Sequence, residues 1–213
     1  MSRQGDKSEQ GVTAIVLAAG ISRRMGADNK LLLPFKGQPL VFRVVSAVCK
    51  ADIARCIVVL GHEAARVKAA LQGLPVEFVV NEAFAEGMGT SISVGVKKAG
   101  VATAGFLVCL SDMPLITTEE YNAIIHQFET SVARNPAVIV RPNHAGQPGN
   151  PVLLASEHRV AMEEQRGAAG CKPIVQQHID QVVYVETSTD HVLQDADTPE
   201  AYAAMRINSK KAG

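Results

Sequence analysis

The sequence lacks the features that mark several large classes of protein. Its 21 Lys and Arg residues balance 21 Asp and Glu residues, so the net charge at pH 7 is zero. No overall electrostatic field would therefore recruit a nucleic acid or a membrane surface. No apolar run approaches the ~20 residues that a bilayer-spanning helix needs. The sequence predicts a protein with neither nucleic-acid nor membrane partners.

Cysteine is also scarce, and its spacing excludes a common kind of metal site. Cys49, Cys56, Cys109 and Cys171 form no CxxC pair, which argues against zinc. We expect reduced, mostly buried thiols in a cytoplasmic protein. The polar stretch MSRQGDKSEQG at the start has no apolar h-region, so we expect no signal peptide, and we predict a disordered tail over residues 1–12.

What is present is a chain of one-domain length with many apolar residues. The chain has 213 residues, of which 47% are hydrophobic, enough to bury a real core. The patterns predict strands over residues 13–19, 55–61, 76–81 and 105–114, and helices over residues 40–50, 62–72, 90–98 and 118–128. This alternation predicts a single-domain, Rossmann-like α/β fold with a mostly parallel sheet and helices on both faces.

The second half of the chain adds further strands to the predicted domain. We expect strands over residues 137–142, 150–156 and 182–187, and a last helix that begins near Pro199. The domain is predicted to span residues 13–205, with a short tail over residues 206–213. Ligands of open α/β sheets bind beyond the carboxyl ends of the strands, so the loops there are the expected site.

A basic loop follows the first predicted strand directly. Gly20 ends the apolar run, and Arg23, Arg24 and Lys30 follow within ten residues. A glycine lets backbone N–H groups approach a phosphate, while Arg and Lys neutralise its charge. The loop matches neither GxxxxGK[ST] nor GxGxxG, which excludes the usual P-loop and dinucleotide-binding motifs. The alternative is a solvated basic turn.

An acid stands at the end of the fourth predicted strand. Asp112 follows LVCLS and precedes Met113 and Pro114, and proline ends a strand because it has no N–H group. A carboxylate at that edge of the sheet could ligate Mg²⁺, which takes one or two carboxylates together with phosphate oxygens and water. The alternative is a simple turn or cap residue.

These residues also carry a family resemblance. LAAGISRRMG, followed by Lys30 and LLLP, resembles the LAAGxSxRMG…K signature of MobA-like nucleotidyltransferases. That family contains molybdenum cofactor cytidylyltransferase and a guanylyl-transferring relative, and it implies a fold of the nucleotide-diphospho-sugar transferase type. LAAG resembles the cytidylyl branch, whereas the guanylyl branch typically reads LAGG. The resemblance implies that the base and phosphates are lined by Leu17, Ala18, Ala19 and Gly20, and neutralised by Arg24 and Lys30. Arg23 occupies a variable position of the signature.

Later segments extend the resemblance over residues 13–205. The DMP motif at Asp112 and the segment QDADTPEAY imply that Asp112 and Asp197 ligate Mg²⁺, with Asp195 a weaker candidate. Thr198 before Pro199 could instead cap a helix, and both roles are compatible.

The segment NEAFAEGMGTSISVG implies that Asn81, Gly89 and Ser91 bind nucleotide. Thr90 and Ser91 could instead cap the following helix. PNHAGQPGNPVLL lies where relatives face the pterin, and we expect its His144 to be an exposed loop residue. QRGAAGCKPIV departs from the family pattern, although Lys172 could replace an expected arginine.

The activity implied by this resemblance is transfer of CMP from CTP to the phosphate of molybdopterin, with release of pyrophosphate. Arg24, Lys30 and Asp112 would be the catalytic residues, Mg²⁺ the cofactor, and a client molybdoenzyme a possible further partner. Two alternatives stay open. One is the same chemistry with GTP or with a sugar-phosphate acceptor, and the other is a non-catalytic carrier of the molybdenum cofactor.

Overall fold

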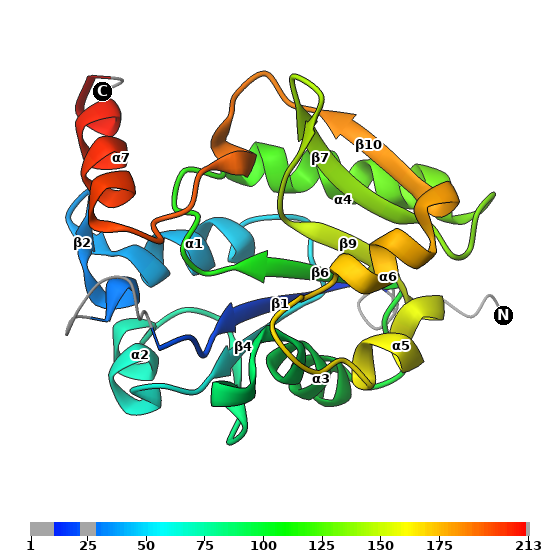
Figure 1. Ribbon diagram of the computed structural model, residues 1–213, viewed down its shortest axis with the longest axis horizontal. Helices are drawn as coiled ribbons and strands as arrows, with labels where there is room; N and C mark the ends of the chain where they lie inside the picture. The colour runs from blue at the N-terminus through cyan, green and yellow to red at the C-terminus, as the bar shows by residue number, and fades with distance from the viewer. Residues whose placement is uncertain (1–10, 22–28, 212–213) are drawn as a thin grey trace, which may run out of the picture.

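A single eight-stranded sheet forms the centre of the molecule (Figure 1). The computed structural model describes residues 11–21 and 29–211. The sheet consists of β1 (Val12–Ala18), β4 (Arg55–Leu60), β5 (Glu77–Val80), β6 (Gly105–Leu110), β7 (Ile139–His144), β8 (Gln147–Pro148), β9 (Val152–Ala155) and β10 (Val182–Glu186). A small separate hairpin pairs β2 (Pro34–Phe35) with β3 (Gln38–Pro39).

The sheet is mostly parallel, as the sequence predicts. Its order is β10-β7-β9-β6-β1-β4-β5, and β8 pairs with β7 at one end. β1 lies parallel to both β4 and β6, whereas β9 runs antiparallel to both β6 and β7. The chain thus leaves β1 toward one edge and later returns to its other side with β6. This reversal of strand order creates the crevice in which ligands of α/β folds bind.

Helices cover both faces of the sheet. They are α1 (Leu40–Cys49), α2 (Ala64–Ala70), α3 (Met88–Ala99), α4 (Thr118–Val132), α5 (Arg159–Glu163), α6 (Lys172–Gln177) and α7 (Pro199–Lys211). Side chains of α1, α2 and α4 pack in the core on one face, and those of α3, α5 and α6 pack on the other. Helix α7 extends beside the hairpin, where the Tyr202 hydroxyl donates to the Pro34 carbonyl at 2.5 Å (Figure 1).

The central strand explains why the first apolar run has no alternation. Every residue of β1 is buried, with Val16 facing the α1 side and Ile15 facing α3. Burial of each such aliphatic side chain contributes about 1.5–3 kcal/mol. Gly95 lets α3 approach β1 closely, because a Cβ atom there would lie 2.5 Å from Cγ2 of Ile15. Glycine is a poor helix former, but at Gly95 its lack of a side chain is what allows the helix to pack against the strand.

Several local features differ from the sequence predictions. α4 continues to Val132 rather than ending near residue 128, and its N-cap is Thr117, whose side chain forms a capping box with Glu120. α7 continues to Lys211, so residues 206–211 belong to a helix rather than to a tail. The hairpin, α5 and α6 were not predicted. The predicted tail over residues 1–12 lies almost wholly outside the described residues.

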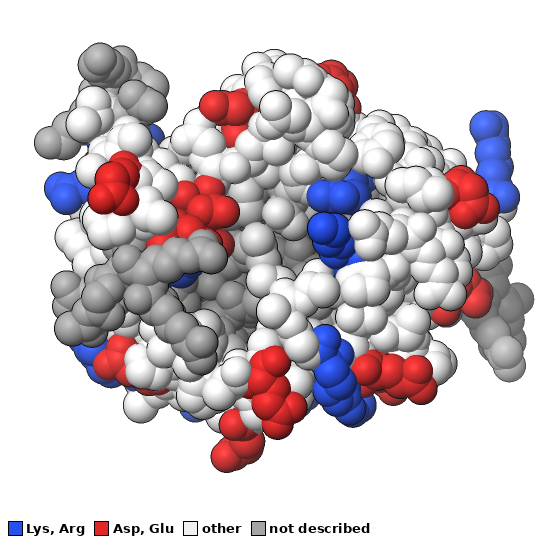
Figure 2. Space-filling view, in the orientation of Figure 1, with Lys and Arg blue, Asp and Glu red and all other residues white. Residues whose placement is uncertain are grey.

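Two compositional predictions can be compared with the described residues. All four cysteines are free thiols, and Cys56, Cys109 and Cys171 are buried. Within residues 11–21 and 29–211, no helix is both long and apolar enough to cross a bilayer. Acidic and basic side chains both occur on the face drawn in Figure 2, and neither sign covers it.

Candidate active site

A cleft of about 630 Å³ opens where the parallel strands end. Its walls come from five segments that are distant in sequence, and their residues were only partly predicted. They include Leu17, Ala19, Gly20, Lys30, Phe84, Gly87, Met88, Ser91, Ser111, Asp112, Ala168, Asp195 and Asp197. The cleft therefore lies beyond β1 and β6, at the reversal of strand order, as expected for a ligand site of an α/β fold.

Lys30 joins the two acids that the sequence analysis assigns to the metal. It begins the short 3₁₀ helix η2 (Lys30–Leu32), which Asn29 caps by accepting the Leu31 N–H at 3.1 Å. The Lys30 ammonium lies 2.5 Å from Oδ2 of Asp112 and also donates to Oδ1 of Asp197. Three predicted residues thus meet in one ionic cluster.

Burial makes this cluster electrostatically strong. The side chains of Lys30, Asp112 and Asp197 are 11%, 16% and 38% exposed. Burial alone lowers the pKa of Lys30, but the charges and hydrogen bonds of the two carboxylates outweigh it, so the pKa stands above its usual 10.5. Lys30 is therefore a fixed cation at neutral pH.

The backbone holds the two acid-bearing segments together. The Ala196 N–H donates to the Asp112 carbonyl at 2.9 Å, and Ala196 itself is fully buried. The Asp197 N–H donates to Oδ1 of Asp195 at 3.2 Å. Thr198 caps α7 by accepting the Ala201 N–H at 3.2 Å, while Asp197 faces the cleft. The capping role considered for Thr198 is therefore confirmed, and metal ligation by Asp197 stays a prediction.

The carboxylates are suitable ligands for a divalent metal whose coordination shell phosphate oxygens would complete. Asp112 Oδ1 is buried and has no hydrogen-bond partner among the described residues. Burial, followed by the charges of Asp112 and Asp197, raises the pKa of Asp195, so this corner is rich in negative charge. In the described part of the chain, no three or more side chains of the ligating types form a ready metal cage. Mg²⁺ suits such a site, because it commonly takes one or two carboxylates and completes its shell with phosphate and water.

The end of β1 and the residues that follow it line part of the cleft. Leu17, Ala19 and Gly20 line it, whereas Ala18 lies in the core with 1% exposure. Ser111, which was not singled out from the sequence, donates its hydroxyl to the Leu17 carbonyl at 2.6 Å and so ties β1 to the segment of Asp112. Arg23 and Arg24 lie outside the described residues.

Asn81 holds together the segment that is predicted to bind nucleotide. It is 1% exposed, and its amide nitrogen lies 2.9 Å from both the Thr90 hydroxyl and the Ser91 hydroxyl. Its carbonyl oxygen accepts the Ala83 N–H at 3.0 Å. Ser91 lines the cleft, whereas the Asn81 side chain forms hydrogen bonds within the loop. Gly87 occupies the N-cap of α3, so Thr90 and Ser91 do not cap that helix.

Gly87 and Gly89 allow a distant loop to close one end of the cleft. The Gly89 N–H donates to the Gly167 carbonyl at 2.8 Å. Gly87 has a φ of +124°, and a Cβ atom there would lie 2.4 Å from the Gly167 carbonyl carbon. This close contact brings Ala168 into the cleft wall. Gly89 thus packs on the Arg166–Gly167 backbone, and its predicted contact with nucleotide stays a prediction.

His144 lies in β7 and has a structural contact. Its Nδ1 atom is 2.9 Å from the Thr187 carbonyl, and the residue is half-buried rather than exposed. The Arg166 guanidinium donates to the Glu163 and Gln165 carbonyls at 3.3 and 2.6 Å and to the Ser93 hydroxyl of α3 at 3.4 Å, so it ties its own loop to α3. Lys172 is exposed at the start of α6.

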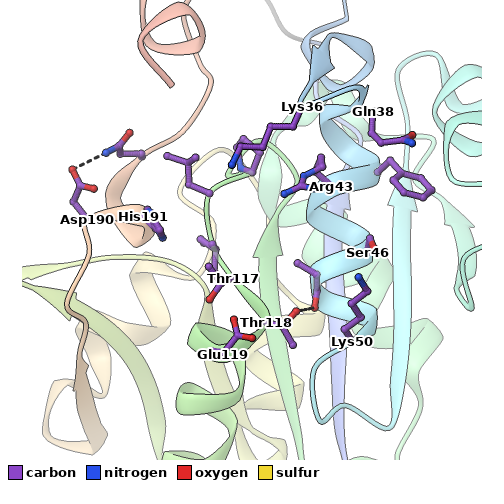
Figure 3. A pocket seen from close by; sticks show the side chains of 16 residues that line it. Lys36, Gln38, Arg43, Ser46, Lys50, Thr117, Thr118, Glu119, Asp190 and His191 are labelled. Carbon is purple, nitrogen blue, oxygen red and sulfur yellow. Dashed lines mark hydrogen bonds between the residues drawn. The ribbon is translucent and has the colours of Figure 1, made fainter. Parts of the chain in front are cut away.

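A second cavity, of about 700 Å³, is lined in part by the residues that follow Asp112 and those that precede Asp195 (Figure 3). Arg43 and Lys50 of α1 lie on one wall, and Glu119 and Asp190 lie on the opposite walls. Its charges are therefore mixed. Lys30, Asp112 and Asp197 line the first cleft instead, so the carboxylates that could hold a metal for a phosphate group lie there beside a cation.

The fold and the cleft define an α/β protein with a charged cleft beyond its parallel strands, and comparison gives its family. Residues 14–182 match the MobA-like NTP transferase domain, and the chain belongs to that family of nucleotidyltransferases.

Two curated relatives illustrate the range of the family. The chain is 30% identical over 174 residues to the bifunctional protein GlmU of Sphingopyxis alaskensis, a match that covers 75% of this chain and 37% of the relative. It thus spans little more than a third of that relative. It is 29% identical over 205 residues to nicotine blue oxidoreductase of Paenarthrobacter nicotinovorans, covering 92% and 97% of the two chains.

Solved structures confirm the fold. A nucleotidyl transferase from Methanothermobacter thermautotroptrophicus superposes with a TM-score of 0.80 at 23% identity, covering 95% of this chain and 99% of that one. The Rv0371c homolog of Mycobacterium sp. strain JC1 gives a TM-score of 0.82 at 23% identity, covering 95% and 98%. The manganese complex of Rv0371c from Mycobacterium tuberculosis H37Rv gives 0.74 at 22% identity, covering 92% and 98%. At these identities the likeness concerns the fold alone.

Proposed function

We propose that this nucleotidyltransferase transfers CMP from CTP to the phosphate of molybdopterin and releases pyrophosphate. The observation that carries the nucleotidyl-transfer chemistry is the bridge from Lys30 to Asp112 and Asp197 at the ends of the parallel strands. It places a fixed cation and two carboxylates in one cleft, which are the groups that a metal-bound triphosphate requires.

The proposed reaction needs positioning more than it needs a base. A phosphate oxygen of the acceptor attacks the α-phosphorus of CTP, and the bond to the pyrophosphate oxygen breaks. A phosphate monoester is already a nucleophile near neutral pH, so no protein base has to remove a proton. Lys30 would stabilise the charge that builds on the departing pyrophosphate, together with Arg24.

Asp112 and Asp197 would hold Mg²⁺ in this cleft. The unpartnered Asp112 Oδ1 is available as a ligand, and the Ala196 N–H to Asp112 carbonyl bond fixes the spacing between the two acid-bearing segments. When bound, the metal would neutralise phosphate oxygens and align them. The manganese complex of Rv0371c supports the use of a divalent metal in this fold.

The donor and acceptor rest mainly on sequence resemblance. The LAAG segment resembles that of the cytidylyl branch. Among structures with this fold are the molybdopterin-guanine dinucleotide biosynthesis protein A of Archaeoglobus fulgidus, with a TM-score of 0.66, and a CMP-2-keto-3-deoxy-manno-octonic acid synthetase complexed with CTP, with a TM-score of 0.71. The four free thiols suit the reducing cytoplasm that we propose as the location.

The test measures pyrophosphate release with CTP, GTP, UTP or ATP, each with Mg²⁺ and molybdopterin. We expect CTP to be preferred and release to depend on molybdopterin. Asp112→Asn should lower turnover by about 10²-fold or more, because it removes a charge that acts on the phosphates. Asp52→Asn is the matched control, since Asp52 is exposed on another part of the surface.

Each other outcome points to a different function. Release with GTP, or only with a sugar phosphate such as glucosamine 1-phosphate, would keep the chemistry and overturn the substrates. Tight binding of cofactor without release under any condition would indicate a carrier. Equal rates for Asp112→Asn and Asp52→Asn, with both proteins folded, would remove the cleft from the mechanism.

A further inference from the structure

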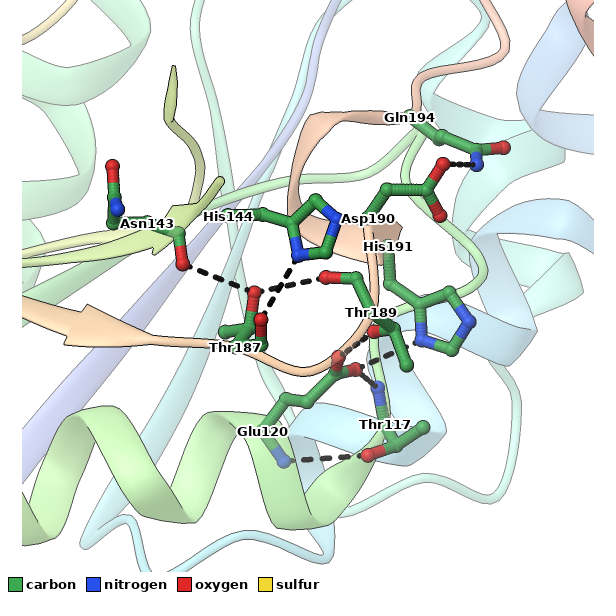
Figure 4. Close-up of polar contacts among 9 residues, drawn as sticks. All are labelled: Thr117, Glu120, Asn143, His144, Thr187, Thr189, Asp190, His191 and Gln194. Carbon is green, nitrogen blue, oxygen red and sulfur yellow. Dashed lines mark hydrogen bonds and ion pairs between the residues drawn. The ribbon is translucent and has the colours of Figure 1, made fainter. Parts of the chain in front are cut away.

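Glu120 makes more contacts than a helix cap requires (Figure 4). It occupies the third position of α4, and its Oε2 atom accepts the Thr117 N–H at 2.8 Å. In return, the Glu120 N–H donates to the Thr117 hydroxyl at 3.3 Å. These two bonds complete the capping box. The same carboxylate also faces a segment that lies about seventy residues further along the chain.

Two side chains of that segment converge on the Glu120 carboxylate (Figure 4). The Thr189 hydroxyl donates to Oε1 at 2.6 Å, and Nδ1 of His191 lies 3.2 Å from Oε2. Because an ionised carboxylate only accepts hydrogen bonds, the proton of this contact is on His191 Nδ1. The Glu120 side chain is 15% exposed, so water competes little for these bonds.

The segment reached by Glu120 leads directly to the acids of the cleft. Thr189 and His191 precede Asp195 and Asp197 by a few residues, with the short 3₁₀ helix η6 (His191–Leu193) between them. On the other side of this contact, the capping residue Thr117 follows Asp112 by five residues. Glu120 therefore joins the stretch after one candidate metal ligand to the stretch before the other.

Other contacts fix the same segment at separate points. The Thr187 N–H donates to the Asn143 carbonyl at 2.8 Å, and the Asn150 N–H donates to the Val192 carbonyl at 2.9 Å. Gly149 leaves no space for a side chain here, because its Cβ would lie 2.4 Å from the Val192 carbonyl oxygen. Between these backbone hydrogen bonds, the Glu120 carboxylate binds the segment through the side chains of Thr189 and His191.

We propose that Glu120 is a positioning residue that holds the segment of Asp195 and Asp197 in register with Asp112. The role of those acids rests on the proposed function. Glu120 acts through Thr189 and His191, and it lies outside the residues that line the cleft. Removing its negative charge would leave the capping box largely formed but would free the 187–197 segment to move.

Three substitutions separate this role from helix capping. Glu120→Gln keeps a side chain suited to the capping box, but an amide offers one acceptor oxygen where the carboxylate offers two. Thr189→Val removes the hydroxyl from the other side of the tether and keeps its volume. Thr117→Ala removes the cap hydroxyl while leaving Thr189 and His191 in contact with Glu120. Glu129→Gln, at an exposed position of α4, is the matched control.

The first readout is amide hydrogen exchange of the full-length protein without metal or nucleotide. Glu120→Gln and Thr189→Val should each raise exchange in residues 187–197 by about 10-fold, the effect of losing a bond to a charged group. Thr117→Ala should raise exchange in the first turn of α4 and leave residues 187–197 as in the wild type. Exchange that is unchanged in both tether variants, or raised equally by Thr117→Ala, would overturn the proposal.

The second readout is the Mg²⁺ concentration for half-maximal pyrophosphate release. Glu120→Gln and Thr189→Val should raise it by about 10-fold, as loss of a residue that orients metal ligands does, whereas Thr117→Ala and Glu129→Gln should not. An Mg²⁺ requirement that stays at the wild-type value in both tether variants would contradict the inference.

Failure of the inference can be told from failure of the proposed function. If the wild-type protein releases no pyrophosphate with any nucleotide, the proposed function fails, and hydrogen exchange still decides whether Glu120 holds the segment. If the wild type is active but exchange in residues 187–197 does not respond to Glu120→Gln, the positioning role alone is refuted.

Discussion

Substituting Lys30 by methionine tests the ionic cluster at the centre of the cleft. The change keeps most of the side-chain volume and removes the ammonium that bridges Asp112 and Asp197. Breaking a fully buried ion pair costs about 3–5 kcal/mol. Because the Asp197 side chain is 38% exposed and can regain water, we expect a smaller loss, of about 1–3 kcal/mol, in the free energy of unfolding.

The two freed carboxylates should then respond to metal more strongly than in the wild type. We expect Mg²⁺ to raise the Tm of Lys30→Met above its metal-free value, since a ligand that binds only the native state stabilises it by mass action. Turnover should fall by about 10²-fold or more even at saturating Mg²⁺, because the charge that faces the departing pyrophosphate is missing.

The assay combines thermal unfolding with pyrophosphate release at pH 7.5. The pKa of Lys30 is raised, so the stability from its pairing is fully present below 10.5 and is lost only as the pH rises through the folded-state value. The chosen pH thus measures the complete effect. Lys97→Met, at an exposed position of α3, is the control. A Lys30→Met protein with wild-type turnover and a Tm indifferent to Mg²⁺ would refute the reasoning.

Two further predictions concern stability and pH. Burial and the nearby carboxylates raise the pKa of Asp195, so its ionisation destabilises the metal-free fold as the pH rises above 3.8. Asp195→Asn should therefore raise the free energy of unfolding in urea at pH 7 and leave it unchanged at low pH. An equal gain at both pH values would contradict this. Burial lowers the pKa of His158, whose Nε2 lies 2.7 Å from the Ala137 carbonyl, so the unfolded chain protonates first and the Tm should fall as the pH drops below 6.5. His158→Gln should flatten that dependence, and an unchanged pH profile would count against it.

Most of the fold could be predicted from the sequence because its central strands are unbroken apolar runs. β1 and β4 are buried on both faces, and the sequence shows this as a lack of alternation. The direction of β9 was not readable, since a short apolar run packs equally well in either direction. Helices α5 and α6 have five and six residues, which is too short for a helical period to emerge.

The cap of α4 could have been predicted from the sequence. Two adjacent threonines precede two adjacent glutamates, and only the pair Thr117 and Glu120 has the spacing of a capping box. That pair was available in the sequence. The additional contacts of Glu120 with Thr189 and His191 were not, because they depend on how the chain returns to α4 after β10.

The site was predicted as a set of residues but not as an arrangement. Lys30 is separated by 82 residues from Asp112 and by 167 from Asp197, and no local spacing could show that it binds both. The family resemblance implies that Asn81 binds nucleotide, and the structure adds that its buried amide holds Thr90 and Ser91. Residues at strand ends serve either the ligand or the loop that faces it, and only the fold distinguishes the two.

The most direct test of the central claim follows the label of radioactive CTP. In the presence of Mg²⁺ and molybdopterin, label in the α-phosphate should appear on the pterin product, and label in the γ-phosphate should appear in pyrophosphate. Both should disappear with Asp112→Asn. Label from the γ-phosphate on the acceptor, or α-label that stays in CTP while molybdopterin is bound, would contradict transfer of CMP by this cleft.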